Sequence, residues 1–140
     1  MTTLGFTGTR HGMTQRQRVT IRYLFSELKL TKLHHGGERH ADAEAHRLAI
    51  GMGAYVVVHP GLAFNLDSDC LGANLVLEAK PNLVRNGDIV LAGIDGLIAA
   101  PAQSNEILRS GTWSTVRRAR KLKRRVWLVF PDGTFKEEIS

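Results

Sequence analysis

Short apolar runs alternate with amphipathic stretches along the chain, and this alternation constrains the fold more than any other feature. The runs that predict strands span residues 4–7, 32–35, 54–59, 96–100 and 126–130. The stretches that predict helices follow Thr14 and span residues 41–52, 82–90 and 115–123. Such alternation is typical of parallel strands joined by right-handed helical crossovers. We therefore expect an α/β fold, a Rossmann-like three-layer sandwich with a mainly parallel central sheet.

Local signals mark the ends of several elements. Thr14 and Gln17 have the spacing of a capping box, which predicts a helix start at this point. Residues 62–81 have mixed polarity and predict a long loop, apart from a short strand at 74–78. Residues 131–133, Pro-Asp-Gly, predict a turn after the final strand.

Composition is that of an ordinary globular protein. The 140 residues fit one domain, which we expect to span residues 1–140, and 43% are hydrophobic while 23% are charged. No apolar run approaches the roughly 20 residues of a membrane helix, and the first residues lack the pattern of an export signal. We therefore expect a cytoplasmic protein with no membrane partner. The single cysteine, Cys70, can form no internal disulfide and is assigned no role.

The chain is basic, with a net charge of +6 and a pI near 10.0. Much of the excess lies between Arg117 and Arg125, within a predicted helix. A solvated helix face, with cations favoured near the helix C-terminus, accounts for this stretch. Contact with nucleic acid or with an acidic ligand is the alternative, although few aromatic residues interleave with the basic ones.

Three polar segments stand where predicted strands end or a helix begins. They are Gly8-Thr9-Arg10, the segment from Gly36 to Asp42, and the segment from Ser110 to Thr115. Because the carboxyl ends of parallel strands meet at one edge of a sheet, we expect these segments to converge there. Helix amino termini at that edge offer unpaired N–H groups to an anion. The sequence therefore predicts a site for a phosphorylated small molecule.

The residue types suit that chemistry. Gly8 permits close backbone approach, Thr9 offers a hydroxyl, and Arg10 offers two donors to one phosphate. Ser110 and Gly111, with the hydroxyls of Thr112 and Thr115, have the composition of an anion-binding nest. A routine turn at Gly8 and a helix-capping role for Asp42 are the alternatives. The glycines match neither the dinucleotide fingerprint nor the P-loop pattern.

Together these motifs resemble those of the SLOG superfamily, the Rossmann-like group that includes the DNA-processing protein DprA and the LOG phosphoribohydrolases. The segments that carry the resemblance are 5–10, 35–42, 85–86, 97–101 and 110–117. The small YspA/YpsA-type members of bacteria and phages look most similar. The resemblance covers nearly the whole chain and is weakest between residues 62 and 81.

The resemblance implies a pocket for a nucleotide or a nucleotide derivative, in a sensor or sequestering module. By motif position, the implied ligand-binding residues are Gly8, Thr9, Arg10, Gly36, Gly37, Asp42, Arg85, Asn86, Ser110, Gly111, Thr112 and Thr115. Relatives often pair, so a homo-oligomer is expected as one possibility. His40 departs from the pattern, because many relatives have glycine at that position.

The alternative is an enzyme that cleaves the glycosidic bond of a nucleotide. Its acid or base would be Glu38 or Asp42, the carboxyl groups of the second segment. The LOG enzymes carry the motif Pro-Gly-Gly-x-Gly-Thr-x-x-Glu, whose glutamate has no counterpart in residues 109–115.

Histidines offer a competing hypothesis. His11, His35 and His59 each lie at or just beyond a predicted strand end, from where they could approach one another and hold a metal. No carboxylate stands at a characteristic spacing beside them, so we predict structural or ligand-contacting histidines, no metal and no cofactor. Trp113 is expected to pack in the fold or to line the pocket, with stacking on a base as the alternative.

Overall fold

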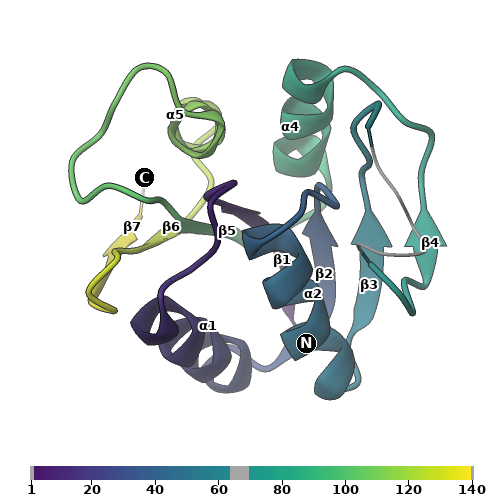
Figure 1. The fold of residues 1–140 in the computed structure, drawn as a ribbon, viewed down its shortest axis with the longest axis horizontal. Helices are drawn as coiled ribbons and strands as arrows, with labels where there is room; N and C mark the ends of the chain where they lie inside the picture. The colour runs from purple at the N-terminus through teal and green to yellow at the C-terminus, as the bar shows by residue number, and fades with distance from the viewer. Residues whose placement is uncertain (1, 64–69, 140) are drawn as a thin grey trace.

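A computed structural model describes residues 2–63 and 70–139. Within these residues, seven strands form one sheet in the order β4-β3-β2-β1-β5-β6-β7 (Figure 1). The strands are β1 (Thr2–Gly8), β2 (Leu30–His35), β3 (Tyr55–Val58), β4 (Leu75–Val76), β5 (Gly96–Ala100), β6 (Val126–Val129) and β7 (Phe135–Glu138). All neighbouring strands pair in parallel except β6 and β7. The expected α/β class and mainly parallel sheet are confirmed.

Helices cover both faces of the sheet. They are α1 (Gln15–Glu27), α2 (Ala41–Gly51), α4 (Asn82–Leu91) and α5 (Gly111–Lys121). Figure 1 shows α1 and α2 on one side of the sheet and α4 and α5 on the other. None of the described helices combines the length and the apolar composition that a membrane span requires.

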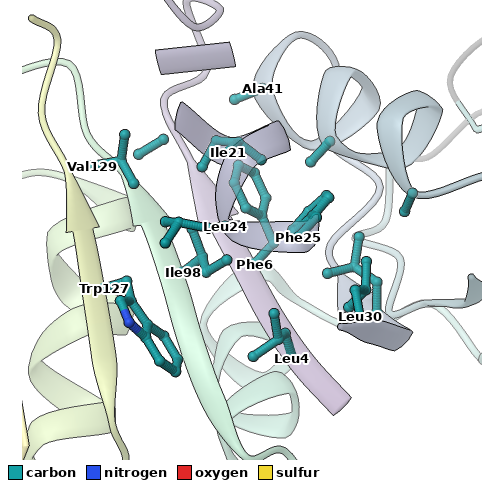
Figure 2. Close-up of a cluster of buried hydrophobic side chains, with 14 of the residues drawn as sticks. Leu4, Phe6, Ile21, Leu24, Phe25, Leu30, Ala41, Ile98, Trp127 and Val129 are labelled. Carbon is teal, nitrogen blue, oxygen red and sulfur yellow. The ribbon is translucent and has the colours of Figure 1, made fainter. Parts of the chain in front are cut away.

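Two apolar cores result from side chains that alternate along the strands. Phe6 and Ile98 point toward α1 and pack with Ile21 and Phe25 (Figure 2). Leu97, one residue before Ile98, belongs to the second core beneath α4 and α5. Every residue of β5 is buried, as expected of a central strand covered on both faces.

The capping box predicted for α1 is confirmed. The Thr14 hydroxyl accepts from the Gln17 N–H at 3.0 Å, and the Gln17 side chain accepts from the Thr14 N–H at 2.9 Å. Gln17 is also 1% exposed, and its Nε2 donates to the carbonyls of Pro101 at 2.8 Å and Val129 at 3.1 Å. The cap therefore fixes α1 to the ends of β5 and β6.

The last predicted helix starts earlier than expected. Helix α5 begins at Gly111 rather than at Thr115, because the Ser110 hydroxyl caps it by accepting from the Trp113 N–H at 3.2 Å. This start places the first turn of α5 beside the ends of β1 and β5.

The strand predicted at residues 126–130 is present as β6, but the prediction that it is the final strand is wrong. The turn at 131–133 is present, and its Gly133 has a φ of +87°, but the chain then returns as β7 and pairs antiparallel with β6. Strand β7 has three charged residues among its four, so it gives no apolar signal. In the expected loop at 62–81, the predicted strand at 74–78 is the two-residue β4, and residues 64–69 lie outside the described part.

Candidate functional site

Three strands end side by side where the chain reverses its direction across the sheet. Strand β1 lies between β2 and β5, and their last residues are Gly8, His35 and Ala100. The Thr9 N–H donates to the Ala100 carbonyl at 3.0 Å. This hydrogen bond connects the start of the loop after β1 to the end of β5. Ligands of open α/β sheets bind at such a switch point, outside the carboxyl ends of the strands.

A cavity of about 280 Å³ lies at this switch point. Of the residues singled out from the sequence, those that line it are Gly8, Thr9, Arg10, His11, Gly36, Glu38, Asp42, Arg85, Asn86, Ser110, Gly111 and Thr112. Gly37 lines an adjoining cavity with Arg10 and Glu38. Thr115 lines neither of these two cavities, because it is fully buried and its hydroxyl donates to the Gly111 carbonyl at 2.9 Å. The three polar segments therefore converge as the parallel sheet requires.

Gly8 allows α2 to approach β1 closely. A Cβ at Gly8 would lie 2.6 Å from the Cβ of Ala41, the first residue of α2, and 3.0 Å from the Phe6 ring. No larger residue fits without moving the helix away from the strand. The glycine therefore brings the start of α2, including Asp42, to the cavity.

One side of the cavity is cationic. Arg10 and Arg109 line it, are exposed, and have no ion pair with any residue that the structure describes. The backbone N–H groups of Gly111 and Thr112, in the first turn of α5, also lack an acceptor within the described residues. Arg109 was missed from the sequence, although its position directly before a helix cap could have indicated it.

The other side carries two carboxyl groups from the second segment. Asp42 is 5% exposed, and its Oδ2 accepts from the Glu38 N–H at 3.2 Å. Burial raises the pKa of the Asp42 carboxyl to about 7, although the nearby Arg85 guanidinium acts in the opposite direction. The side chain of Glu38 is about half exposed and accepts from Arg85 at 2.7 Å. A buried carboxyl that titrates near neutral pH in a cavity is a candidate functional group.

Arg85 joins the loops around these carboxyl groups. It is 4% exposed, and one terminal nitrogen donates to the carbonyls of Gly36 at 2.5 Å and His59 at 3.4 Å. Its other nitrogens donate to Glu38 at 2.7 Å and to Asn86 at 2.7 Å. Arg85 therefore lines the cavity with most of its donors already bonded to protein groups.

The prediction that His11, His35 and His59 could approach one another is wrong. His59 instead contacts His34, with 2.8 Å between ring nitrogens, and His35 contacts His46 of α2 at 2.9 Å. Burial lowers the pKa of each of these four rings, and it lowers the pKa of His59 to about 4, with the neighbouring His34 adding to the shift. Among the described histidines, only His11 lines the 280 Å³ cavity.

Near the second histidine pair lies Cys70, and the candidate ligand atoms of His35, His46 and Cys70 all lie within 4.8 Å of one another. Among the described residues, this buried group comes nearest to a metal-ligand set. However, neutral tautomers satisfy every ring nitrogen: the Gly37 N–H donates to His35, His35 to His46, and His46 to the Leu71 carbonyl at 2.7 Å. A metal would have to displace these hydrogen bonds, which connect β2, the loop after it, α2 and Leu71. The two histidines are therefore better described as structural residues.

His40 stands in backbone geometry that favours glycine. Its φ is +71° and its ψ is −108°, directly before α2, and its side chain makes no capping hydrogen bond. Such conformations strain residues that carry a Cβ. His40, which stands where many relatives have glycine, therefore adopts a backbone conformation that glycine would adopt with less strain.

The basic stretch from 117 to 125 is largely engaged with the protein itself. Arg120 forms ion pairs with Glu106 and Glu138, and Arg125 pairs with Glu137 and lies over the Trp127 ring. Arg117 pairs with Glu106 and donates to the carbonyls of Ile107 and Leu108 at 3.1 Å, which fixes the loop that carries Arg109. Arg118 and Arg124 donate to the carbonyls of Leu83 and Val90. Trp113, only 2% exposed, packs in the second core.

Comparison with known structures places this fold among characterised proteins. DNA processing protein A from Streptococcus pneumoniae is similar with a TM-score of 0.71 and 20% identity over 91% of this chain. The molybdenum cofactor binding protein of Rippkaea orientalis is similar with a TM-score of 0.68 and 19% identity over 92% of the chain, and 76% of that protein is covered. DNA processing protein A from Helicobacter pylori, studied for its single-stranded DNA binding mode, gives a TM-score of 0.61 and 19% identity over 91% of this chain and 64% of that one.

These likenesses establish the fold. The chain has the same Rossmann-like fold as these proteins, as the alternation of strands and helices in the sequence indicated. It spans half the length of the pneumococcal protein. A scan of family models and a search of curated proteins both found no match.

Proposed function

We propose that the chain binds a nucleotide or a nucleotide-derived small molecule at the carboxyl edge of its sheet and acts as a sensor or sequestering module. The observation that carries this proposal is the cationic side of the cavity, where Arg10, Arg109 and the first turn of α5 present donors without acceptors among the described residues. Phosphate oxygens supply the missing acceptors. The Rippkaea neighbour, which binds a cofactor, is compatible with a small ligand on this fold.

A thermal-shift screen tests the proposal. The probes are mono-, di- and triphosphates of nucleosides, cyclic nucleotides and ADP-ribose. One charge-assisted arginine contact with several backbone donors supports micromolar affinity, about −8 kcal/mol. Flat melting curves for every probe, with no heat of binding in calorimetry, would contradict the proposal.

Substitution Arg10→Ala separates ligand binding from folding. Because Arg10 is exposed and has no partner among the described residues, we expect the free energy of unfolding to change by no more than about 0.5 kcal/mol. Affinity for the probe identified in the screen should fall roughly 10- to 100-fold, as the loss of a charge-assisted hydrogen bond requires. Arg22→Ala, an exposed arginine on α1, is the matched control and should bind like the unmodified chain.

A second candidate function, hydrolysis of the glycosidic bond of a nucleotide, is favoured by Asp42. This carboxyl lines the cavity, and a pKa of about 7 suits a group that accepts or donates a proton near neutral pH. Glu38 is less suited, because Arg85 already holds it as an ion pair. Helix α5 has Ser114 and Thr115 where the LOG motif would place its glutamate.

We expect bound nucleotides to survive prolonged incubation intact, with no free base detected by chromatography. The absent motif glutamate is the reason, since cleavage needs a group that stabilises developing charge at the sugar. Steady release of base that stops in Asp42→Asn, while binding persists, would instead make the chain a nucleotide hydrolase.

Nucleic-acid binding through the Arg117–Arg125 stretch is the weaker alternative. The Helicobacter pylori neighbour has a single-stranded DNA binding mode, and a basic chain is compatible with such a partner. The five arginines of this stretch, however, all bond to groups of the protein itself. Their donors are therefore less available to phosphodiesters than those of Arg10 and Arg109.

A further inference from the structure

The cavity changes its chemical character along the edge of the sheet. The strands that end there run in the order β2, β1, β5. Glu38 and Asp42, which accept hydrogen bonds, follow β2, whereas Arg10 follows β1 and the first turn of α5 follows β5. A ligand that fills the cavity therefore meets donors at one end and acceptors at the other.

The acceptor end has capacity that the protein does not fill. An ionised carboxylate can accept about four hydrogen bonds. Among the described residues, Asp42 accepts from the backbone N–H groups of Glu38 and Gly36, and Glu38 accepts from one N–H of Arg85, so about half or more of the acceptor sites stay open. A phosphate dianion has no hydrogen to donate to these atoms, but a hydroxyl group has one.

We propose that Asp42 and Glu38 accept hydrogen bonds from the sugar hydroxyls of the ligand, so that the cavity selects ribonucleotides over 2′-deoxyribonucleotides. This inference rests on the proposed function and names its substrate class. The phosphate lies toward Arg10, Arg109 and α5, and the ribose lies toward α2. A phosphate on the 2′ position is disfavoured, because it would bring like charge to the two carboxylates.

The burial of Asp42 gives this contact its selectivity. A site built to bond a hydroxyl rejects an analogue without it when the acceptor left behind is shielded from water. Asp42 is 5% exposed, so water compensates poorly for a missing hydroxyl. The half-exposed Glu38 is expected to contribute less to the selectivity.

Calorimetry at pH 8 with four nucleoside 5′-monophosphates and their 2′-deoxy counterparts tests the inference. We expect at least one ribonucleotide to bind about tenfold or more tightly than its 2′-deoxy form. In Asp42→Ala, which removes both acceptor oxygens, this ratio should fall to within about threefold, and Glu38→Ala should lower it by a smaller factor. Glu27→Ala, which removes an exposed carboxylate on α1, serves as the control and should keep the full ratio.

Each outcome decides between the hypotheses. Equal affinities for ribo and deoxy forms would overturn the hydroxyl contact and leave nucleotide binding in place. A ribose preference that survives both substitutions would also overturn it. Absence of binding for every monophosphate and for the wider set of probes would overturn the proposed function itself. Denaturation curves for each variant establish that the folded protein is being compared.

Discussion

Substitution Asp42→Asn is expected to raise the free energy of unfolding at pH 8 and to leave it nearly unchanged near pH 4. Burial raises the pKa of the folded-state carboxyl to about 7 from an ordinary value of 3.8. Between these two values the unfolded chain releases its proton while the folded chain keeps it, so stability falls as pH rises. Each unit corresponds to about 1.4 kcal/mol, so a shift of about three units corresponds to roughly 4 kcal/mol at pH 8. Above pH 7 both states are ionised and the penalty is constant.

Urea denaturation at pH 4, 6 and 8 measures this effect. Asparagine keeps an acceptor for the Glu38 N–H, so the substitution removes the charge while preserving that hydrogen bond. Glu27→Gln should show no comparable change between pH 4 and pH 8, because its carboxyl is exposed. A variant that is less stable than the unmodified chain at pH 8 would show that the ionised carboxyl is well solvated or paired. The expected result supports a function for Asp42, since binding sites commonly hold groups that lower stability.

Substitution Arg85→Ala should change stability in the opposite direction to Asp42→Asn and lower the free energy of unfolding by roughly 2–4 kcal/mol. The carbonyls of Gly36 and His59 would lose a donor in a buried setting, at about 1–3 kcal/mol for each unpaired group. The pKa of Asp42 should rise further in this variant, because the guanidinium lowers it in the unmodified chain. Denaturant midpoints at an unchanged slope measure the loss.

The Arg85 result also decides what this residue does at the cavity. Arg22→Ala, whose side chain is exposed, should change stability by less than about 0.5 kcal/mol. A loss below about 1 kcal/mol for Arg85→Ala, together with weaker nucleotide binding, would indicate that the guanidinium serves the ligand. The expected large loss instead indicates that it holds the cavity wall in place.

The sequence predicted the convergence of the three segments because that convergence follows from topology. Once strands and helices alternate, β1, β2 and β5 must end at the same edge. Gly8 ends β1, Gly36 follows β2, and Gly111 begins the helix that follows β5. Contacts such as the one between Arg85 and Gly36 cannot be predicted in this way, because they join residues 49 positions apart through side-chain geometry. Strand β7 was missed because its pairing depends on the turn and on β6 rather than on an apolar pattern.

The histidine pairing could have been predicted more closely. His34 and His35 are neighbours in β2, so their side chains point to opposite faces of the sheet. His35 therefore faces α2 and contacts His46, while His34 is left to contact His59. Alternation within the strand, rather than nearness to the strand end, determines which rings meet.

The two edges of the sheet bear on how copies of this chain could associate. Exposed edge strands are templates for pairing with another molecule, and proteins block them with short strands or charged side chains. Here β4 has only two residues, and β7 carries Lys136, Glu137 and Glu138. Neither edge favours extension of the sheet from one molecule to the next, which also lowers the risk of aggregation. Any homo-oligomer of this chain is therefore expected to form through helices or loops.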